Sequence, residues 1–231
     1  MSRPSLVLVP GLNNTSAVFD GVVAELGDAA DVFTPTLPAL DTVEALADHV
    51  LAQAPAKFHL VGFSFGAYVA MAMLERAPER IEALCLIGAG PGADTPDKRP
   101  IREGAIAKAR EDYLGMVSAQ AGAAFHPDTL KRADVMDARA AMVRDYGAER
   151  FIAHTTAAMN RPDRRKLLAN LKTTLLLIAG ETDPLAPPAE LEKTAAAARA
   201  IETHIVPAAG HLAPLEQPAR VADHIKQWLS A

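Results

Sequence analysis

The sequence predicts an α/β fold: a doubly wound, all-parallel sheet of six strands, with helices on both faces and a helical cap inserted over one end. Short apolar runs of strand length alternate with helical stretches, which is typical of a parallel sheet covered by helices. Most of these runs are continuously hydrophobic, as strands buried on both faces should be. Right-handed crossovers then predict the spatial order 2-1-3-4-5-6, with strands numbered along the chain.

The predicted strands are short apolar segments on both sides of a long central stretch: residues 6–9, 32–34, 58–62, 83–87, 174–179 and 203–206. The helices between them carry apolar residues on one side. Val43, Leu46 and Val50 form one such stripe, and Val221 and Ile225 belong to another. We expect both stripes to pack against the sheet.

The alternation of strands and helices stops in the middle of the chain. Helical segments rich in Ala and Met fill this part: residues 101–119, 128–145 and 148–160. Gly147 separates the last two, and the whole stretch is too long for a simple crossover. We therefore expect one domain over residues 1–231, with an inserted helical cap at about 93–165.

Composition narrows the classes of partner. The formal net charge is -5 and the sequence pI is near 5.8, so nothing in the charge favours a nucleic acid or an anionic membrane surface. The apolar run at residues 6–9 is too short for a signal-peptide core or a membrane span. We expect a cytoplasmic protein that acts on a small molecule, without a membrane or nucleic-acid partner. No Zn-type motif such as H-E-x-x-H occurs, so no metal or cofactor is expected.

The segment Gly62-Phe63-Ser64-Phe65-Gly66 follows a buried-type strand and precedes a helix of small residues. This is the context of a nucleophile elbow, in which a sharp, strained turn exposes the serine hydroxyl. A side chain at either glycine would collide with the neighbouring strand and helix. Ser64 is therefore the candidate nucleophile. The alternative is a glycine-rich loop in which Ser64 only caps a helix.

A serine hydroxyl needs an adjacent base, and that base needs an acceptor to hold its tautomer. His211 is the best-placed base, because it lies in a short loop after the last predicted strand. Asp183, just past the preceding strand, is the candidate acid, with Glu181 as the competitor. The chain order Ser64, Asp183, His211 favours Asp183. Among the other histidines only His154 keeps interest, because the cap that carries it can roof a pocket.

Attack on a carbonyl also requires N–H donors for the oxyanion that forms. The backbone N–H of Phe65, next after Ser64, should supply one. The second is assigned to Leu12, in the glycine-containing loop after the first strand. The alternative for that loop is an ordinary strand-to-helix turn.

Together these segments resemble the α/β-hydrolase fold superfamily, in its compact bacterial branch of serine hydrolases with a helical cap. The resemblance spans almost the whole chain, through residues 9–12, 62–66, 180–184 and 210–218. It implies hydrolysis of carboxylic esters or related acyl compounds through an acyl-enzyme, with a small-molecule acyl substrate. Serine at position 64 disfavours the branches of the family that use a carboxylate nucleophile. Carbon–carbon bond hydrolysis, thioester hydrolysis and acyl transfer by the same fold stay open.

Two departures from the family pattern matter. Pro10 stands where many members have a histidine before the oxyanion glycine, so this loop lacks the hydrogen bonds with which such a histidine would brace it. The first predicted strand begins at residue 6, without the antiparallel pair that often opens the fold. We therefore expect an all-parallel core.

Two alternative functions, from other classes of protein, remain open. One is a small-molecule receptor that keeps this fold without catalysis, since fold alone does not decide function. The other is a nucleotide-binding protein, suggested by Gly88-Ala89-Gly90-Pro91-Gly92 after a strand. This segment lacks the sixth-position glycine of the dinucleotide motif, and Pro91 and Pro96 disfavour the helix that would receive the phosphate.

The substrate is expected in an apolar cleft between cap and sheet, because four of the seven methionines lie in the cap and methionine adapts to irregular apolar shapes. The candidate lining residues are apolar or aromatic: Leu12, Val18, Phe19, Phe65, Tyr113, Met116, Phe125, Met142, Tyr146, Phe151 and Leu185. The sequence identifies neither the acyl group nor the oligomeric state.

Overall fold

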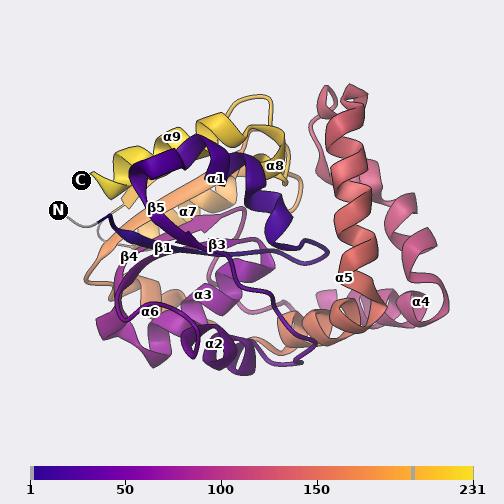
Figure 1. The fold of residues 1–231 in the computed structure, drawn as a ribbon. Coiled ribbons are helices and arrows are strands. Elements are labelled where there is room, and N and C mark those ends of the chain that lie inside the picture. Colours follow the sequence, from indigo (N-terminus) through magenta and orange to yellow (C-terminus); the bar gives the residue numbers. More distant parts are fainter. Residues whose placement is uncertain (1–2, 199–200, 231) are drawn as a thin grey trace.

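The computed structural model describes residues 3–198 and 201–230 and is built around one six-stranded sheet (Figure 1). Its order is β2-β1-β3-β4-β5-β6, and each neighbouring pair is parallel. The predicted order and direction are confirmed, and every predicted strand overlaps an observed one. The strands are β1 (Ser5–Val9), β2 (Asp31–Phe33), β3 (Phe58–Phe63), β4 (Ile81–Ile87), β5 (Thr174–Gly180) and β6 (Ile201–Val206).

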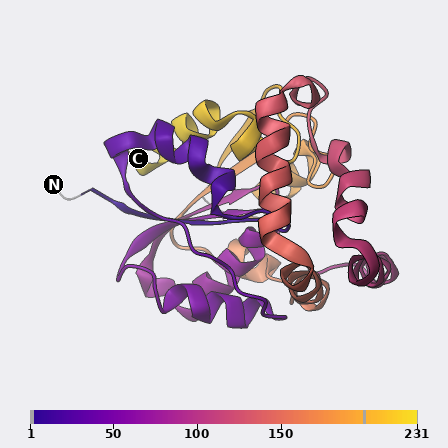
Figure 2. The same cartoon turned by 45° about the vertical axis from the view of Figure 1, so that its right-hand side comes forward.

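Helices cover both faces of the sheet (Figures 1 and 2). Helices α1 (Asp20–Leu26) and α9 (Pro218–Leu229) lie side by side on one face. On the other face lie α2 (Val43–Leu51), α3 (Phe65–Arg76) and α7 (Pro188–Ala197). The expected stripes on α2 and α9 are buried in these two layers.

The two apolar layers explain why the strands are hydrophobic throughout. In β1, Leu6 and Leu8 enter the layer with α1 and α9, whereas Val7 and Val9 enter the layer with α2 and α3. All four side chains are fully buried. Because successive side chains of a strand point to opposite faces, a strand between two layers has no solvent-facing position.

The cap lies beside the carboxyl ends of the strands, between β4 and β5 in the sequence (Figures 1 and 2). Its two long helices are α4 (Lys98–Ala119) and α5 (Ala133–Asn160), which pack against each other. The predicted break at Gly147 is confirmed, since its φ of 76° interrupts α5. Within the described residues, none of the helices combines the length and apolar character needed to cross a membrane.

One predicted helix start is wrong. The helix expected from residue 128 begins only at Ala133, and Thr129–Lys131 forms a 3-10 turn instead. The cause is tertiary: the Thr129 hydroxyl donates to buried Glu216 at 2.7 Å, and the N–H of His126 donates to the same carboxylate at 2.8 Å. These contacts tie the segment to the core before the helix starts.

Two buried arginines form ion pairs at the ends of the cap. Asp94, at its beginning, pairs with Arg161, at its end, over 2.6 Å. Arg164 is buried and pairs with Glu44 of α2 at 2.7 Å and with Glu75 of α3 at 2.9 Å. Removing the partners of either arginine would leave a buried charge unpaired. The first pair therefore joins the two ends of the cap, and the Arg164 pairs join the chain after the cap to α2 and α3. Helix α6 (Arg165–Ala169) follows directly and leads into β5.

Candidate active site

The turn between β3 and α3 holds Ser64 in a conformation that non-glycine residues rarely adopt, with φ 52° and ψ -117°. Neighbouring backbone leaves no room for side chains on either side of it. A Cβ at Gly62 would lie 2.5 Å from the Cα of Ala67, and one at Gly66 would collide with the carbonyl oxygen of Val9. The strain is therefore enforced by close packing between β1, β3 and α3.

Three loops at the carboxyl edge of the sheet bring Ser64, His211 and Asp183 together. The Ser64 hydroxyl lies 2.8 Å from Nε2 of His211. On the other side of the ring, Nδ1 of His211 lies 2.8 Å from Oδ2 of Asp183. His211 and Asp183 are buried, whereas Ser64 stays partly accessible. The arrangement can take a proton from the serine hydroxyl at Nε2 while the carboxylate holds the proton on Nδ1.

The carboxylate of Asp183 stays charged although it is buried. Burial opposes the charge, but the hydrogen bond and charge of His211 and the N–H groups of Ala186 and Leu185 outweigh it and hold the pKa of Asp183 below its usual range. Oδ1 accepts those two N–H groups at 2.9 and 2.8 Å, which leaves Oδ2 for the imidazole. The competitor Glu181 is exposed and accepts the N–H of Ala208 instead.

The glycine-rich segment after β4 packs against this pair of side chains. Gly88 has φ 62°, and a Cβ there would lie 3.2 Å both from Oδ2 of Asp183 and from Cε1 of His211. The next helix starts only at Lys98. The segment thus makes room for the His–Asp pair and does not lead into a helix N-terminus, so the geometry does not support the nucleotide-binding reading.

The loop at residues 10–14, which we call the oxyanion loop, lies against the elbow. A Cβ at Gly11 would be 3.1 Å from Cβ of Ser64. Among the described residues, the N–H of Leu12 has no hydrogen-bond acceptor. Phe65 is the first residue of α3, where an N–H has no partner within the helix. Both N–H groups are thus without an acceptor among the described residues, one directly after Ser64 in the chain and the other next to Gly11, which lies against Ser64.

Glu216 is a buried residue of this region that the sequence reasoning missed. It is 1% exposed. Its Oε1 accepts the N–H of Gly210, next to His211, at 2.9 Å, and its Oε2 accepts from His126 and Thr129 of the cap. One carboxylate thus joins the histidine loop to the cap. A charged residue inside the apolar run before Pro218 was the sequence signal for it.

We expect Glu216→Gln to lower the free energy of unfolding by about 2 kcal/mol, because the new amide N–H₂ must face a buried N–H donor. Urea denaturation measures the change. The exposed residue Glu192 offers a matched control, and Glu192→Gln should change the free energy by less than about 0.5 kcal/mol. Equal stability of the two variants would contradict this role of Glu216.

His154 lies fully buried under the elbow. Its ring stacks on the ring of Phe65 with centroids 5.0 Å apart. Nε2 contacts the carbonyl oxygen of Pro38 at 2.7 Å, and Nδ1 contacts the hydroxyl of Tyr146. Burial lowers the pKa of His154 to about 4, so the ring is neutral at pH 7. The geometry gives it a supporting place against Phe65, where both ring nitrogens have partners other than Ser64.

This burial predicts a dependence of stability on pH. The unfolded chain takes up a proton at His154 near pH 6.5 and the folded chain only near pH 4, so acid favours unfolding in that interval. His154 should therefore contribute about 3 kcal/mol to the free energy of unfolding above pH 6.5, and this contribution should be lost as the pH falls toward 4.

Urea denaturation of His154→Gln across this interval tests the point, because the variant should show a flatter pH profile. Burial also lowers the pKa of His59 and His224, so the difference from the wild type isolates His154. His49→Gln, on α2, should keep the wild-type profile. Parallel profiles for His154→Gln and the wild type would rule the effect out.

The predicted pocket residues separate into groups. Val18 and Phe19 belong to the sheet core with 0% exposure, a correction whose cause is the tight packing of the turn before α1. Leu185 is 68% exposed, also a correction, because the turn held by Asp183 directs it to solvent. Phe125 and Met142 join the same core as Phe19. A third cluster lies between α4 and α5 and contacts Leu12: Tyr113, Tyr146 and Phe151, with Met116 at its border.

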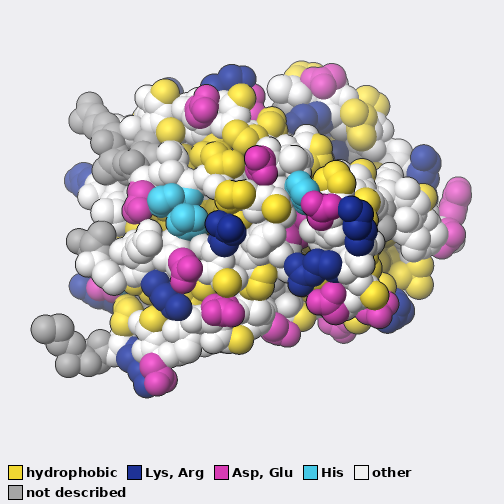
Figure 3. Space-filling view, turned by 90° about the horizontal axis from the view of Figure 1, so that it is seen from above, with side chains coloured by type: hydrophobic (Ala, Val, Ile, Leu, Met, Phe, Trp, Pro, Cys, Tyr) yellow, Lys and Arg dark blue, Asp and Glu magenta, His cyan; other side chains and the backbone are white. Residues whose placement is uncertain are grey.

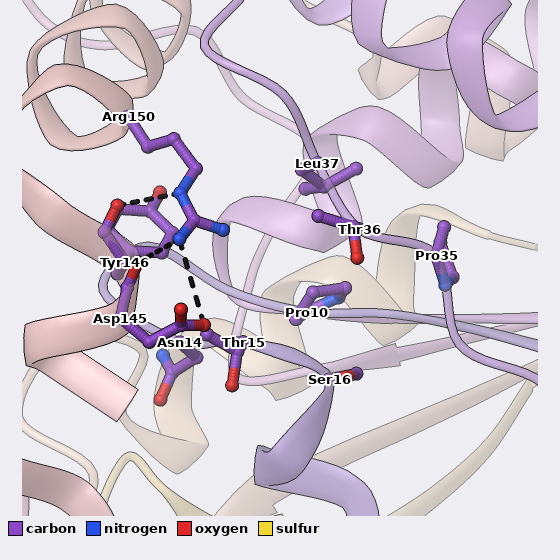
Figure 4. Close-up of a pocket in the computed structure, with 10 residues that line it drawn as sticks. All are labelled: Pro10, Asn14, Thr15, Ser16, Pro35, Thr36, Leu37, Asp145, Tyr146 and Arg150. Atoms are coloured by element: carbon purple, nitrogen blue, oxygen red, sulfur yellow. Dashed lines mark hydrogen bonds and ion pairs between the residues drawn. The ribbon is translucent and has the colours of Figure 1, made fainter. Parts of the chain in front are cut away.

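Two hollows lie near this third cluster. A polar cavity of about 110 Å³ lies between the loops after β1 and β2 and helix α5. Figure 4 shows Tyr146 and Arg150 on one side of it and Thr36 and Leu37 on the other. An open groove of about 450 Å³ lies between α4 and α5, with Tyr113 in its wall. In the described part of the chain, no group of three His, Cys, Asp or Glu residues is arranged to hold a metal ion.

Comparison with known proteins agrees with this geometry. Residues 6–224 match the profile of the "Alpha/beta hydrolase family". The chain belongs to this family. Within it, the chain is similar to a pimeloyl-[acyl-carrier protein] methyl ester esterase of Xanthomonas campestris pv. campestris (strain B100), with 26% identity over 99% of this chain and 96% of that protein. That relative is named an esterase, and a protein from Enterobacter sp. (strain 638) that matches 98% of this chain with 26% identity is named a 2-succinyl-6-hydroxy-2,4-cyclohexadiene-1-carboxylate synthase.

Other matches differ in extent. The esterase of the same name from Nitrosomonas europaea is 30% identical, but the match covers 38% of each chain, well short of that protein's length. A thermophilic esterase from Thermogutta terrifontis superposes with a TM-score of 0.92 and 26% identity, over 99% of this chain and 90% of that one. The similarity in fold thus extends over the core and the cap together.

Proposed function

We propose that this hydrolase cleaves carboxylic esters of a small-molecule acyl substrate through an acyl-enzyme on Ser64. The observation that carries the proposal is the chain of two 2.8 Å contacts from Ser64 through His211 to Asp183, at a strained turn. Nucleophile, base and orienting acid in hydrogen-bond reach are the arrangement that nucleophilic acyl transfer requires.

The steps follow from the positions of these groups. The Ser64 oxygen attacks the ester carbonyl while its proton passes to Nε2 of His211, and the carbonyl oxygen becomes an oxyanion beside the N–H groups of Leu12 and Phe65. The imidazolium then gives the proton to the leaving alcohol, and Ser64 keeps the acyl group. A water molecule, deprotonated by His211, attacks the acyl-enzyme and releases the carboxylic acid. Asp183 balances the charge of the imidazolium in both acylation and deacylation.

The acyl group is proposed to contact the apolar cluster between α4 and α5, because that cluster touches Leu12 of the oxyanion loop. Its members there are Tyr113, Met116 and Phe151. Acidic and basic side chains are mixed over the face seen in Figure 3, which suits a small substrate better than a polyanion. We therefore propose no nucleic-acid partner and no membrane partner.

Ester hydrolysis is favoured over thioester or carbon–carbon bond hydrolysis because the Xanthomonas and Thermogutta proteins, which match over almost the whole chain, are named esterases. The test is a series of p-nitrophenyl esters of graded acyl length, together with a fluorophosphonate probe. We expect turnover without accumulation of a covalent adduct, and labelling of Ser64 by the probe. Stoichiometric binding of esters without turnover would instead support a receptor.

A further inference from the structure

The oxyanion loop has little support of its own. Within the loop, the N–H of Asn14 donates to the carbonyl of Gly11 at 3.2 Å, and its side-chain amide donates to the carbonyl of Leu12 at 2.7 Å. Asn13 has φ 59°, a left-handed conformation that costs free energy outside glycine. Pro10 provides neither a backbone N–H nor a polar side chain. A loop of this kind keeps its N–H groups aimed only if other elements hold it.

Both cap helices contact this loop. The hydroxyl of Tyr113, on α4, donates to Oδ1 of Asn13 at 2.9 Å. Arg139, on α5, donates from Nη1 to the carbonyl oxygen of Asn13 and to Oδ1 of Asn14, the latter at 3.0 Å. Two consecutive loop residues are thus bound by side chains that are 100 or more positions away in the sequence.

The surroundings of Arg139 differ from those of a surface arginine. Its side chain is partly buried, and no carboxylate of the described residues pairs with it. Burial lowers the pKa of Arg139 to about 10, against the opposing influence of the Tyr113 and Tyr146 hydroxyls beside it. A desolvated guanidinium is costly, and here its hydrogen bonds go to the loop. Charge-assisted bonds of this kind are stronger than neutral ones and restrict the geometry of their acceptors.

We propose that Arg139 and Tyr113 are positioning residues, which hold the oxyanion loop from the cap and so keep the N–H of Leu12 aimed at the reacting carbonyl. This inference rests on the proposed function, because an oxyanion donor matters only in acyl transfer. The cap then does more than cover the substrate: it replaces the bracing that a histidine at position 10 would give. Catalysis depends on the cap even for an ester too small to touch it.

The test compares Arg139→Met, Arg139→Lys and Tyr113→Phe on a short ester such as p-nitrophenyl acetate. For Arg139→Met we expect kcat to fall about 10- to 100-fold with KM changed less than about threefold, because a misaimed donor weakens transition-state binding alone. Labelling of Ser64 by the fluorophosphonate should slow in parallel. Arg139→Lys keeps the positive charge but not the planar guanidinium with its several N–H donors. Its kcat should therefore fall less than that of Arg139→Met. Tyr113→Phe should show the smallest fall in kcat, because Arg139 still holds the loop.

Arg144, which is exposed on the same helix, provides the control, and Arg144→Met should keep wild-type kinetics. Urea denaturation of each variant shows whether it folds. If Arg139→Met does not fold, Arg139→Lys becomes the variant on which the proposal is tested. Unchanged kcat and labelling in a folded Arg139 variant, or a rise of KM without loss of kcat, would overturn the positioning role alone. A probe that fails to label Ser64 in the wild type would overturn the proposed function as well.

Discussion

Replacing Ser64 with alanine should reduce ester hydrolysis by about 10⁴- to 10⁶-fold while the protein stays folded, because a methyl group cannot form the acyl-enzyme. Alanine meets the same strained φ of 52° that serine already accepts, so the turn is not disturbed further. Steady-state rates on p-nitrophenyl esters measure the loss, and urea denaturation checks the fold. Ser118→Ala, at an exposed position of α4, should retain full activity.

The same measurement on His211→Ala and on the double variant tests whether the two residues act as one unit. We expect His211→Ala to lose nearly as much as Ser64→Ala, and the double variant to lose no more than either. Independent losses that multiply would mean that Ser64 and His211 act in separate steps. Activity near the wild-type level in Ser64→Ala would exclude Ser64 as nucleophile.

The sheet and the three central side chains were predictable because the signals are local. A buried parallel strand is a continuous apolar run, and the elbow is a five-residue pattern in which both glycines are required by packing. The loops that carry Asp183 and His211 follow strands, and the carboxyl ends of parallel strands meet at one edge. The contacts among Ser64, His211 and Asp183 follow from the topology once the order of the strands is known.

The supporting contacts were not predictable, because they join residues that are distant in the sequence. Glu216 accepts hydrogen bonds from the His126 N–H and the Thr129 hydroxyl of the cap, 90 and 87 positions away, and Arg139 binds the oxyanion loop over 126 positions. No local sequence pattern indicates either of these contacts. The same limit explains Val18 and Phe19: apolar residues near an active-site loop can face the cleft or the core, and only the packing of α1 decides.

Replacing Asp183 with asparagine should also be severe, with kcat lowered about 10⁴-fold and the fold retained. Glu181→Gln is the matched control, because Glu181 lies two residues away, is exposed and only accepts the N–H of Ala208. A glutamine oxygen can accept that N–H equally well, so its activity should stay within about twofold of the wild type. A mild effect at Asp183 with a severe one at Glu181 would reverse the assignment of the acid.

The severity at Asp183 follows from the hydrogen bonds around its carboxylate. Oδ1 accepts the N–H groups of Leu185 and Ala186 at 2.8 and 2.9 Å, so the amide of an asparagine must keep its oxygen there. The N–H₂ group then takes the place of Oδ2 and faces Nδ1 of His211. Because that group donates, it stabilises the tautomer with the proton on Nε2, which cannot accept the proton of Ser64. The rest of the site would stay in place around a base that carries its proton on the wrong nitrogen.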